Sequence, residues 1–312
     1  MGKVAYLFPG QGSQFVGMGA DLEAAFPEAR EVFRRADAAL GEELSGLCFA
    51  GPEEHLRLTA NTQPAILTVS LAAFAVLAAH GRTPAAVAGH SLGEYSAIGA
   101  AGGLVLEDLV RIVRLRGQLM QEAVPVGVGA MAAVLGPPRS EVEAACREAS
   151  QAESVVVAVN FNAPEQTVIA GHAAAVARAG ALLSQRGAKR VVPLPVSAPF
   201  HSPLMRPARE RLAPALAALP FATLSVPLYT NVDAIPVLEP EAVRESLVRQ
   251  VDAPVRWVES IQRMVADGFD TFVEVGPGSV LSGLVKRIAR GVTTLQVGTA
   301  AQVEAFLTGS EA

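Results

Sequence analysis

The stretch Ala85-Ala86-Val87-Ala88-Gly89-His90-Ser91-Leu92-Gly93 joins a short apolar run to a helical pattern that begins at Leu92. Apolar residues of this kind ahead of a glycine are typical of a buried strand. Glycines on both sides of Ser91 allow the close backbone approach of a tight strand-to-helix turn, and the helix N-terminus favours negative charge beside the serine. The stretch therefore predicts a nucleophile elbow with Ser91 at its tip. The alternative is a serine that caps the helix on a buried turn.

Short apolar runs alternate with longer helical patterns towards both ends of the chain. Strands are expected at residues 4–8, 85–88, 227–230, 269–275 and 293–297. Helices are expected at residues 21–40, 65–79, 240–250, 256–266 and 279–290. This alternation predicts an α/β fold built on a mostly parallel, hydrolase-like sheet.

The middle of the chain follows a different order. Its pattern predicts a strand at 130–135, a helix at 140–150, strands at 155–161 and 167–170, a helix at 173–186 and a strand at 190–194. This order, βαββαβ, is that of a ferredoxin-like unit, and Ser140 with Glu143 suggests a capping box for its first helix. We therefore expect a small inserted domain at 127–196 within a large catalytic domain at 1–126 and 197–312. A cleft between the two is a common place for a ligand.

A serine nucleophile needs a general base, and His201 is the best candidate among five histidines. It lies between Pro199 and Pro203, which discourage helix and fix a loop. The alternative is a surface histidine that caps the following helix. The order serine, acid, late histidine of an α/β-hydrolase does not map onto this chain, because only Asp108 separates the two as an aspartate. Glutamates in that interval remain candidates for orienting the histidine.

Two further segments carry candidate binding groups. The loop from Phe8 to Gln14 has two glycines of a dinucleotide fingerprint, but Phe15 stands where the third should be. Such a loop either donates backbone N–H groups to an oxyanion or is a plain turn. Arg116 is expected to face away from the solvated Arg111 and Arg114, and an arginine in a cleft suits bidentate binding of a carboxylate.

Composition excludes several classes of function. The chain has 312 residues with 25 basic and 30 acidic side chains, a net charge of −5, which gives no field to hold nucleic acid. Its two cysteines, Cys48 and Cys146, form neither a disulfide framework nor a metal knot, so a reducing, cytoplasmic compartment is expected and no metal. The best apolar run, 65–79, falls short of about 20 residues, so no membrane span is expected.

Through the elbow at Ser91, the loop from Phe8 to Gln14, the His201 loop and Arg116, the chain resembles the malonyl-CoA:acyl carrier protein transacylases of fatty-acid synthesis. More distantly, it resembles the acyltransferase domains of polyketide synthases. The resemblance covers nearly the whole chain. Its motifs are Phe8-Pro-Gly-Gln-Gly-Ser-Gln14, Asn61-Thr-Gln-Pro64, Gly89-His-Ser-Leu-Gly-Glu94, Arg116-Gly117, Gly129-Ala-Met131, Asn160-x-Asn-x-Pro-x-Gln166, Ser197-Ala-Pro-Phe-His-Ser202, Asn231-Val-Asp233, Gln250 with Pro254-Val-x-Trp257, and Glu274-Val-Gly-Pro-Gly278.

The resemblance implies a role for each catalytic position. Ser91 would be acylated, His201 would be the general base, and a carbonyl oxygen at Gln250 would accept the His201 N–H in place of an acid. Backbone N–H groups of Gln11 and Leu92 would form the oxyanion hole.

The resemblance also implies the substrate contacts. Arg116 would hold the free carboxylate of malonyl, with Gln63 beneath the pocket. Asn160 and Gln166 would line the wall that the small domain contributes. Phe200 before the histidine and Leu92 after the serine are the malonyl pattern, because Phe200 would fill the space that an α-methyl group needs.

The implied reaction is ping-pong transfer from malonyl-CoA, a CoA thioester substrate, to acyl carrier protein, by a monomer without bound cofactor. Two basic clusters are candidates for carrier docking, namely Lys189 with Arg190 and Lys286 with Arg287 and Arg290. The alternatives are a stand-alone polyketide-pathway acyltransferase, a serine thioesterase or hydrolase, and a non-catalytic module that binds carrier protein.

Overall fold

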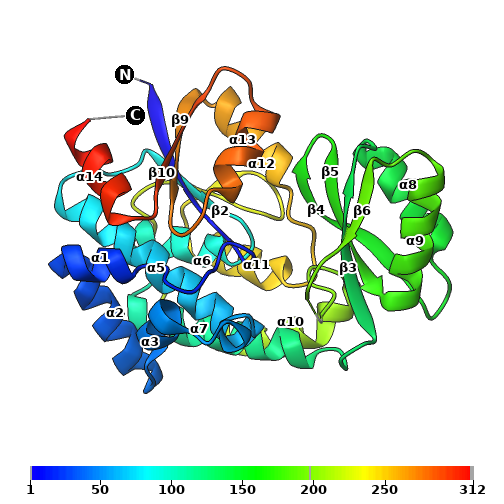
Figure 1. Ribbon diagram of the computed structural model, residues 1–312, viewed down its shortest axis with the longest axis horizontal. Coiled ribbons are helices and arrows are strands. Elements are labelled where there is room, and N and C mark those ends of the chain that lie inside the picture. The colour runs from blue at the N-terminus through cyan, green and yellow to red at the C-terminus, as the bar shows by residue number, and fades with distance from the viewer. Residues whose placement is uncertain (1, 197, 310–312) are drawn as a thin grey trace.

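The computed structural model describes residues 2–196 and 198–309, and its strands form two sheets (Figure 1). The larger sheet has the strand order β10-β9-β1-β2-β7-β8. Its strands are β1 (Lys3–Phe8), β2 (Ala86–Gly89), β7 (Leu228–Tyr229), β8 (Pro236–Val237), β9 (Phe269–Val275) and β10 (Thr293–Val297). Neighbours pair in parallel, except that β7 and β8 pair antiparallel. The predicted α/β fold with a mostly parallel sheet is confirmed, and the two-residue β8 was missed.

Both faces of the larger sheet are buried, as alternate residues of β1 show. Tyr6 and Phe8 belong to the core on one face, and Ala5 and Leu7 to the core on the other. The core on the first face includes residues of α1 (Ala20–Ala25), α2 (Pro27–Leu40), α3 (Leu44–Ala50), α4 (Glu53–Leu56), α5 (Thr59–Ala79), α6 (Gly93–Ala100), α7 (Leu106–Glu122), α10 (Arg206–Ala217), α11 (Pro240–Gln250) and α14 (Ala300–Thr308). The second packs against α12 (Trp257–Ala266) and α13 (Val280–Ile288). A parallel sheet covered on both faces leaves the carboxyl ends of its strands for a site.

The second sheet is antiparallel and has the order β4-β5-β3-β6. Along the chain its elements are β3 (Gly129–Leu135), α8 (Arg139–Ala149), β4 (Val156–Ala163), β5 (Gln166–His172), α9 (Ala173–Gln185) and β6 (Arg190–Pro193). The βαββαβ order expected for a ferredoxin-like unit is confirmed. Its strands and helices fall within 127–196, while the domain boundaries themselves stay a prediction, and residue 197 lies outside the described residues.

Backbone hydrogen bonds join the small sheet to the larger part of the molecule beside β4. Val255, in the loop before α12, donates to the Val159 carbonyl at 2.8 Å and accepts from the Phe161 N–H at 3.0 Å. Figure 1 shows the small sheet and its two helices, in green, beside this region. The strand that carries Asn160 is thereby held close to the carboxyl ends of the larger sheet.

Two local expectations were wrong. The helix expected at 21–40 is divided, because Phe26 is extended and Pro27, which lacks an N–H, begins a new helix. The capping box of Ser140 does not form: α8 begins one residue earlier, after Pro138, so Ser140 lies inside the helix. Instead Arg139 Nε donates to Glu143 Oε1 at 2.6 Å.

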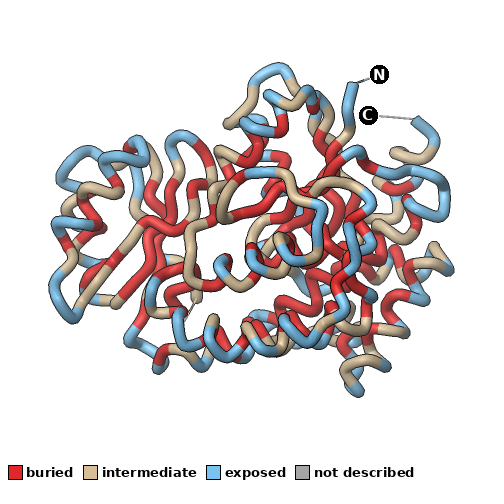
Figure 2. Tube along the Cα trace, turned by 180° about the vertical axis from the view of Figure 1, so that it is seen from behind, coloured by how far each residue is buried: buried red, intermediate tan, exposed pale blue. Residues whose placement is uncertain are grey.

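Helix α5 is longer than the sequence pattern suggested, at 21 residues. Among the described residues it is the one helix with the length and apolar character of a membrane span, and most of it is buried inside the protein. Figure 2 shows the buried segments running through the interior of both parts of the molecule. Burial of this kind explains the apolar composition of α5 as that of a core helix.

Candidate active site

The turn around Ser91 is a nucleophile elbow. Ser91 has a φ of 52°, in the left-handed region that costs energy for a residue with a side chain. A Cβ on Gly89 would lie 1.9 Å from the Gly93 carbonyl carbon, and one on Gly93 would lie 1.9 Å from the Phe8 oxygen. Both positions therefore require glycine, and they bring the end of β2 against the start of α6 and the end of β1.

Asn231, after β7, holds this strained turn from the opposite side. Its Oδ1 accepts the Ser91 N–H at 2.7 Å, and its Nδ2 donates to the Gly89 carbonyl at 2.6 Å. The two bonds bracket the elbow and compensate part of its backbone strain. Asn231 begins the motif Asn231-Val-Asp233, and no role was predicted for it from sequence.

His201 is placed to act on Ser91. Its Nε2 lies 2.7 Å from Ser91 Oγ, and its Nδ1 lies 2.8 Å from the carbonyl oxygen of Gln250. A carbonyl only accepts, so Nδ1 carries the hydrogen and Nε2 is left to accept the serine proton. Burial and the positive charge of Arg116 lower the pKa of His201 to about 3, which keeps the imidazole neutral.

Arg116, on α7, is fully buried and points at the nucleophile. Its Nη1 donates to Gln63 Oε1 at 2.9 Å, and its Nη2 donates to Gln250 Oε1 at 2.8 Å and to Ser91 Oγ at 3.2 Å. The guanidinium lies 5.4 Å from the centre of the Tyr95 ring. Its Nε–H has no partner among the described residues. A buried guanidinium with spare donors beside a nucleophile suits an anionic substrate group.

A cavity of about 100 Å³ opens in front of Ser91. Besides Ser91, Arg116 and His201 it is lined by five residues that the sequence singled out, namely Gln11, Gln63, Leu92, Asn160 and Phe200. Met120, Met131, Leu194 and Val196 add an apolar wall. The volume lies well below the roughly 300 Å³ of pockets that hold drug-sized ligands, so the cavity suits a short acyl group.

Gln11, Leu92 and Gln166, the other residues predicted for the site, are placed differently. The backbone N–H groups of Gln11 and Leu92 donate to no other described residue, so they are available to an oxyanion. Gln166 does not line the cavity: it begins β5 and pairs in register with Leu135 and Ala163, towards the far end of the sheet. Its expected place on the small-domain wall of the cleft stays a prediction.

Glu94 is the site residue that sequence reasoning missed. It lies one turn after Ser91, fully buried, and burial raises the pKa of its carboxyl to about 7. Its carboxylate accepts hydrogen bonds from the Asn231 N–H, Gln250 Nε2 and Ser246 Oγ. An acidic residue in an otherwise apolar helix was the available signal.

One groove brings together Lys189 from the first predicted docking cluster and all three residues of the second. Lys189 lies just before β6, Lys286 and Arg287 lie at the end of α13, and Arg290 lies two residues beyond it; the four line a concavity of about 560 Å³. Lys189 Nζ lies 2.8 Å from Glu165 Oε2, so one of these cations already has a partner. Arg190 is exposed on β6 and does not line the groove.

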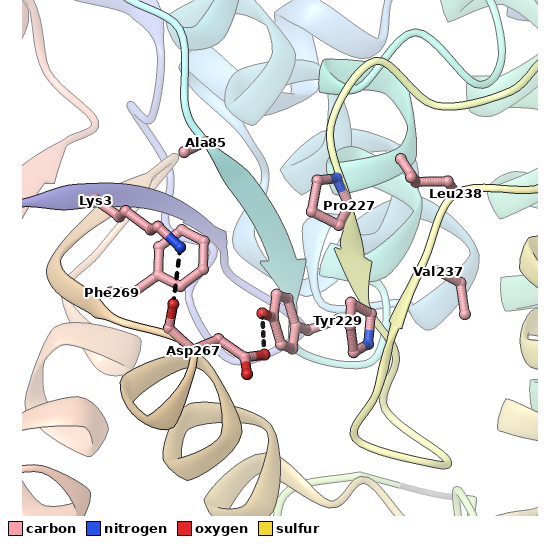
Figure 3. A pocket seen from close by; sticks show the side chains of 9 residues that line it. Lys3, Ala85, Pro227, Tyr229, Val237, Leu238, Asp267 and Phe269 are labelled. Carbon is pink, nitrogen blue, oxygen red and sulfur yellow. Dashed lines mark hydrogen bonds between the residues drawn. The ribbon is translucent and has the colours of Figure 1, made fainter.

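The concavity shown in Figure 3, of about 570 Å³, lies at the amino ends of the strands, away from Ser91. Its polar groups satisfy one another: Lys3 Nζ donates to the Asp267 carbonyl at 2.9 Å, and the Tyr229 hydroxyl donates to Asp267 Oδ2 at 2.6 Å. No serine, cysteine or histidine lines it, so its size does not make it the reactive site. Across the described residues, no group of three or more acidic, histidine or cysteine side chains is arranged to hold a metal ion.

Comparison with known proteins agrees with this geometry. Residues 5–304 match the acyl transferase domain family. The chain belongs to that family. This acyl transferase is 50% identical over 294 residues to the malonyl CoA-acyl carrier protein transacylase of Escherichia coli K12, covering 94% of this chain and 95% of the relative.

Solved structures show the same likeness. The malonyl CoA-acyl carrier protein transacylase of Coxiella burnetii superposes with a TM-score of 0.96 at 43% identity, covering 98% of this chain and 97% of that one. A malonyl-transacylase in complex with a type II PKS acyl-carrier protein superposes with a TM-score of 0.96 at 44% identity, covering 98% and 99%.

Proposed function

We propose that this acyl transferase moves the malonyl group from malonyl-CoA to the phosphopantetheine thiol of acyl carrier protein, supplying fatty-acid synthesis. The observation that carries the proposal is Arg116, buried and 3.2 Å from a serine that is itself 2.7 Å from a neutral histidine. A nucleophile alone fits many esterases. A buried cation beside it favours an acyl group with a free carboxylate, because an unpaired buried charge is costly.

The first half-reaction acylates the enzyme. His201 Nε2 takes the hydroxyl proton as Ser91 Oγ attacks the thioester carbonyl, and the Gln11 and Leu92 N–H groups stabilise the oxyanion. The C–S bond then breaks, and His201 returns the proton to the CoA sulfur. The product is a malonyl-Ser91 ester, with its carboxylate held by Arg116.

The second half-reaction runs the same steps with a different thiol. The phosphopantetheine thiol of the carrier gives its proton to His201 and attacks the ester, and Ser91 leaves with the proton restored. The basic groove formed by Lys189, Lys286, Arg287 and Arg290 is a suitable docking surface for an acidic carrier. The order of events predicts ping-pong kinetics.

The cavity supports malonyl over larger groups. Phe200 and Leu92 both line it, and the bulk of the Phe200 ring reduces the space for a branched substituent. The reaction uses only side chains and backbone donors of one chain, so it needs no bound cofactor and is compatible with a monomer. The described thiols, Cys48 and Cys146, are both free and buried, which supports a reducing compartment such as the cytoplasm.

A polyketide-pathway role is the second candidate, because one structural relative of equal likeness is a malonyl-transacylase bound to a type II PKS acyl-carrier protein. The chemistry of the two roles is the same and the carrier differs. Transfer rates to a fatty-acid carrier and to a polyketide carrier, measured side by side, separate them. A clear preference for the polyketide carrier would replace the fatty-acid assignment.

The test of the function is intact-protein mass spectrometry after brief exposure to malonyl-CoA. Wild-type protein should gain the mass of one malonyl group, lose it on addition of holo acyl carrier protein, and keep it in water alone. Ser91→Ala should gain nothing while retaining its fold. An adduct on Ser91→Ala, or rapid loss of the adduct to water, would refute transfer through Ser91 and favour a different nucleophile or a hydrolase.

A further inference from the structure

Glu94 is a buried carboxylate that touches the residues around the reacting atoms and none of those atoms themselves. Its Oε2 accepts from the Asn231 N–H at 3.1 Å and from Gln250 Nε2 at 2.8 Å, and its Oε1 accepts from Ser246 Oγ at 3.2 Å. These partners come from the loop after β7 and from α11, which are more than 130 residues away along the chain. One carboxylate thus connects three segments that meet at Ser91.

The side-chain amide of Gln250 has one orientation that fits its surroundings. Arg116 only donates hydrogen bonds, so the atom 2.8 Å from its Nη2 must be the amide oxygen. The Ser91 carbonyl and the Glu94 carboxylate only accept, so the atom 3.0 Å from the first and 2.8 Å from the second must be the amide nitrogen. The amide therefore lies between a buried cation and a buried carboxylate.

Of the two hydrogen bonds that the amide nitrogen donates, the one to Glu94 is the shorter, at 2.8 Å against 3.0 Å to the Ser91 carbonyl. Without it the amide retains only the Ser91 carbonyl as acceptor and can rotate. Rotation would turn the NH₂ group towards Arg116, where a second donor is repelled. The guanidinium would then lose one of the two amide oxygens, Gln63 Oε1 and Gln250 Oε1, that hold it in place.

We propose that Glu94 is a positioning residue for recognition of the acyl carboxylate: it fixes the Gln250 amide, which in turn aims Arg116 at the cavity in front of Ser91. The inference rests on the proposed malonyl transfer and extends it to a residue that does not contact the substrate. The property that Glu94 supplies is a side chain long enough to bring an acceptor oxygen within hydrogen-bond distance of Gln250 Nε2. The burial that raises the pKa of Glu94 agrees with a role for its acceptor geometry in either protonation state, since a protonated carboxyl keeps one oxygen for the two N–H groups.

Two conservative variants separate the effect of the length of the Glu94 side chain from the effect of its charge. Glu94→Asp keeps the carboxylate and withdraws it by one methylene, beyond hydrogen-bond distance of Gln250 Nε2. Glu94→Gln keeps an oxygen at that distance and removes the charge, and its NH₂ group can donate to the Ser246 hydroxyl. The readout is the ratio of kcat/KM for malonyl-CoA to kcat/KM for acetyl-CoA, because acetyl has no carboxylate for Arg116. General loss of structure lowers both values together and leaves the ratio unchanged.

A buried donor left without its acceptor corresponds to about fivefold to a hundredfold. Glu94→Asp should therefore lower the malonyl-to-acetyl ratio by at least about fivefold relative to Glu94→Gln. Glu274 provides the matched control, since it is equally buried and accepts from the Leu281 and Ser282 N–H groups, away from the Ser91 cavity. Glu274→Asp should lower the thermal midpoint and leave the ratio unchanged.

A double-mutant cycle tests the route through Gln250. Gln250→Leu removes the amide and keeps the backbone carbonyl that accepts from His201. If Glu94 acts through this amide, adding Glu94→Asp to Gln250→Leu should lower the malonyl-to-acetyl ratio no further. Fully additive losses would show that Glu94 acts by another route and would overturn the proposal.

The outcomes are distinguishable from those of the proposed function. Wild-type protein that forms no malonyl adduct on Ser91 refutes the transfer itself. Wild-type protein that forms the adduct, with equal ratios in Glu94→Asp and Glu94→Gln, refutes only the positioning role. A ratio that falls in Glu94→Gln and not in Glu94→Asp would mean that charge, and not reach, is what Glu94 supplies, which also overturns the proposal.

Discussion

Arg116 Nη2 lies 3.2 Å from Ser91 Oγ, and the two side chains line the same small cavity. The distance places a permanent positive charge within one short acyl chain of the atom that is acylated. Because the guanidinium is fully buried, a substrate that pairs with it is favoured over one that leaves it unpaired. In the proposed transfer, selection of the acyl group and activation of the nucleophile would therefore be carried out by neighbouring atoms.

Arg116→Ala should reverse the preference between acyl donors. The malonyl carboxylate would be buried without a partner, which should lower kcat/KM for malonyl-CoA by at least about thirtyfold, while acetyl transfer is retained or rises. Arg116→Lys should recover little, because an ammonium cannot form the two parallel bonds. Steady-state kinetics with both donors measure this. An equal fall for the two donors would remove Arg116 from the acyl pocket.

Acylation should be insensitive to mild acid. Since burial and Arg116 lower the pKa of His201 to about 3, the base stays neutral where an ordinary histidine, with a pKa near 6.5, would be protonated. The rate of malonyl-Ser91 formation should therefore hold as pH falls from 8 to about 5. In Arg116→Ala the pKa of His201 rises, and the acid limb should move to higher pH.

The same lowered pKa affects stability. Below pH 6.5 the unfolded chain binds a proton at His201 that the folded chain does not, so the free energy of unfolding should decrease as pH falls from about 6.5 towards 3. Denaturant unfolding of wild type and His201→Gln across this range isolates the contribution.

Phe200→Ser should relax the choice of acyl group. The Phe200 ring lines the cavity beside His201, and its removal opens space for an α-methyl substituent. One methyl group is worth about 1 to 3 kcal/mol, so discrimination against methylmalonyl-CoA should fall by about tenfold to a hundredfold. Competition between malonyl-CoA and methylmalonyl-CoA reports the ratio. An unchanged ratio would place the methyl group elsewhere in the cavity.

Carrier docking should depend on the α13 cluster more than on Lys189. Lys286, Arg287 and Arg290 are exposed in the groove, whereas Lys189 is paired with Glu165. Reversal of the three α13 charges to glutamate should weaken transfer to acyl carrier protein at low salt and leave acylation by malonyl-CoA nearly unchanged. Reversal of Arg30, Arg34 and Arg57, which are exposed and lie outside the groove, is the matched control. Equal effects on both half-reactions would indicate misfolding.

Local features of the site were predictable from sequence because their causes are local. Gly89 and Gly93 bracket Ser91, and the need for glycine arises from contacts within the turn itself and with the adjacent strand. The alternation of strands and helices likewise follows from the period of the apolar residues. The order βαββαβ in the middle of the chain needed no more than this.

Features that depend on side-chain direction were not predictable. Gln166 belongs to a motif that includes Asn160, yet it begins β5 opposite Ala163 and is not among the residues that line the cavity. Helix capping by Ser140 failed because Pro138 allows the helix to begin one residue earlier. The two-residue β8 is too short to leave a periodic signal.

The sequence by itself determined the elbow at Ser91, the strand and helix rhythm, and the presence of a base and a cation of the required types. Tertiary structure alone decided that Arg116 faces the serine, that the Gln250 carbonyl orients His201, and that two distant basic clusters share one groove. It also decided that Glu94 is buried against Asn231 and Gln250. The physical reason is that hydrogen-bond geometry across more than a hundred residues depends on how whole elements pack, and no local pattern of side chains records that packing.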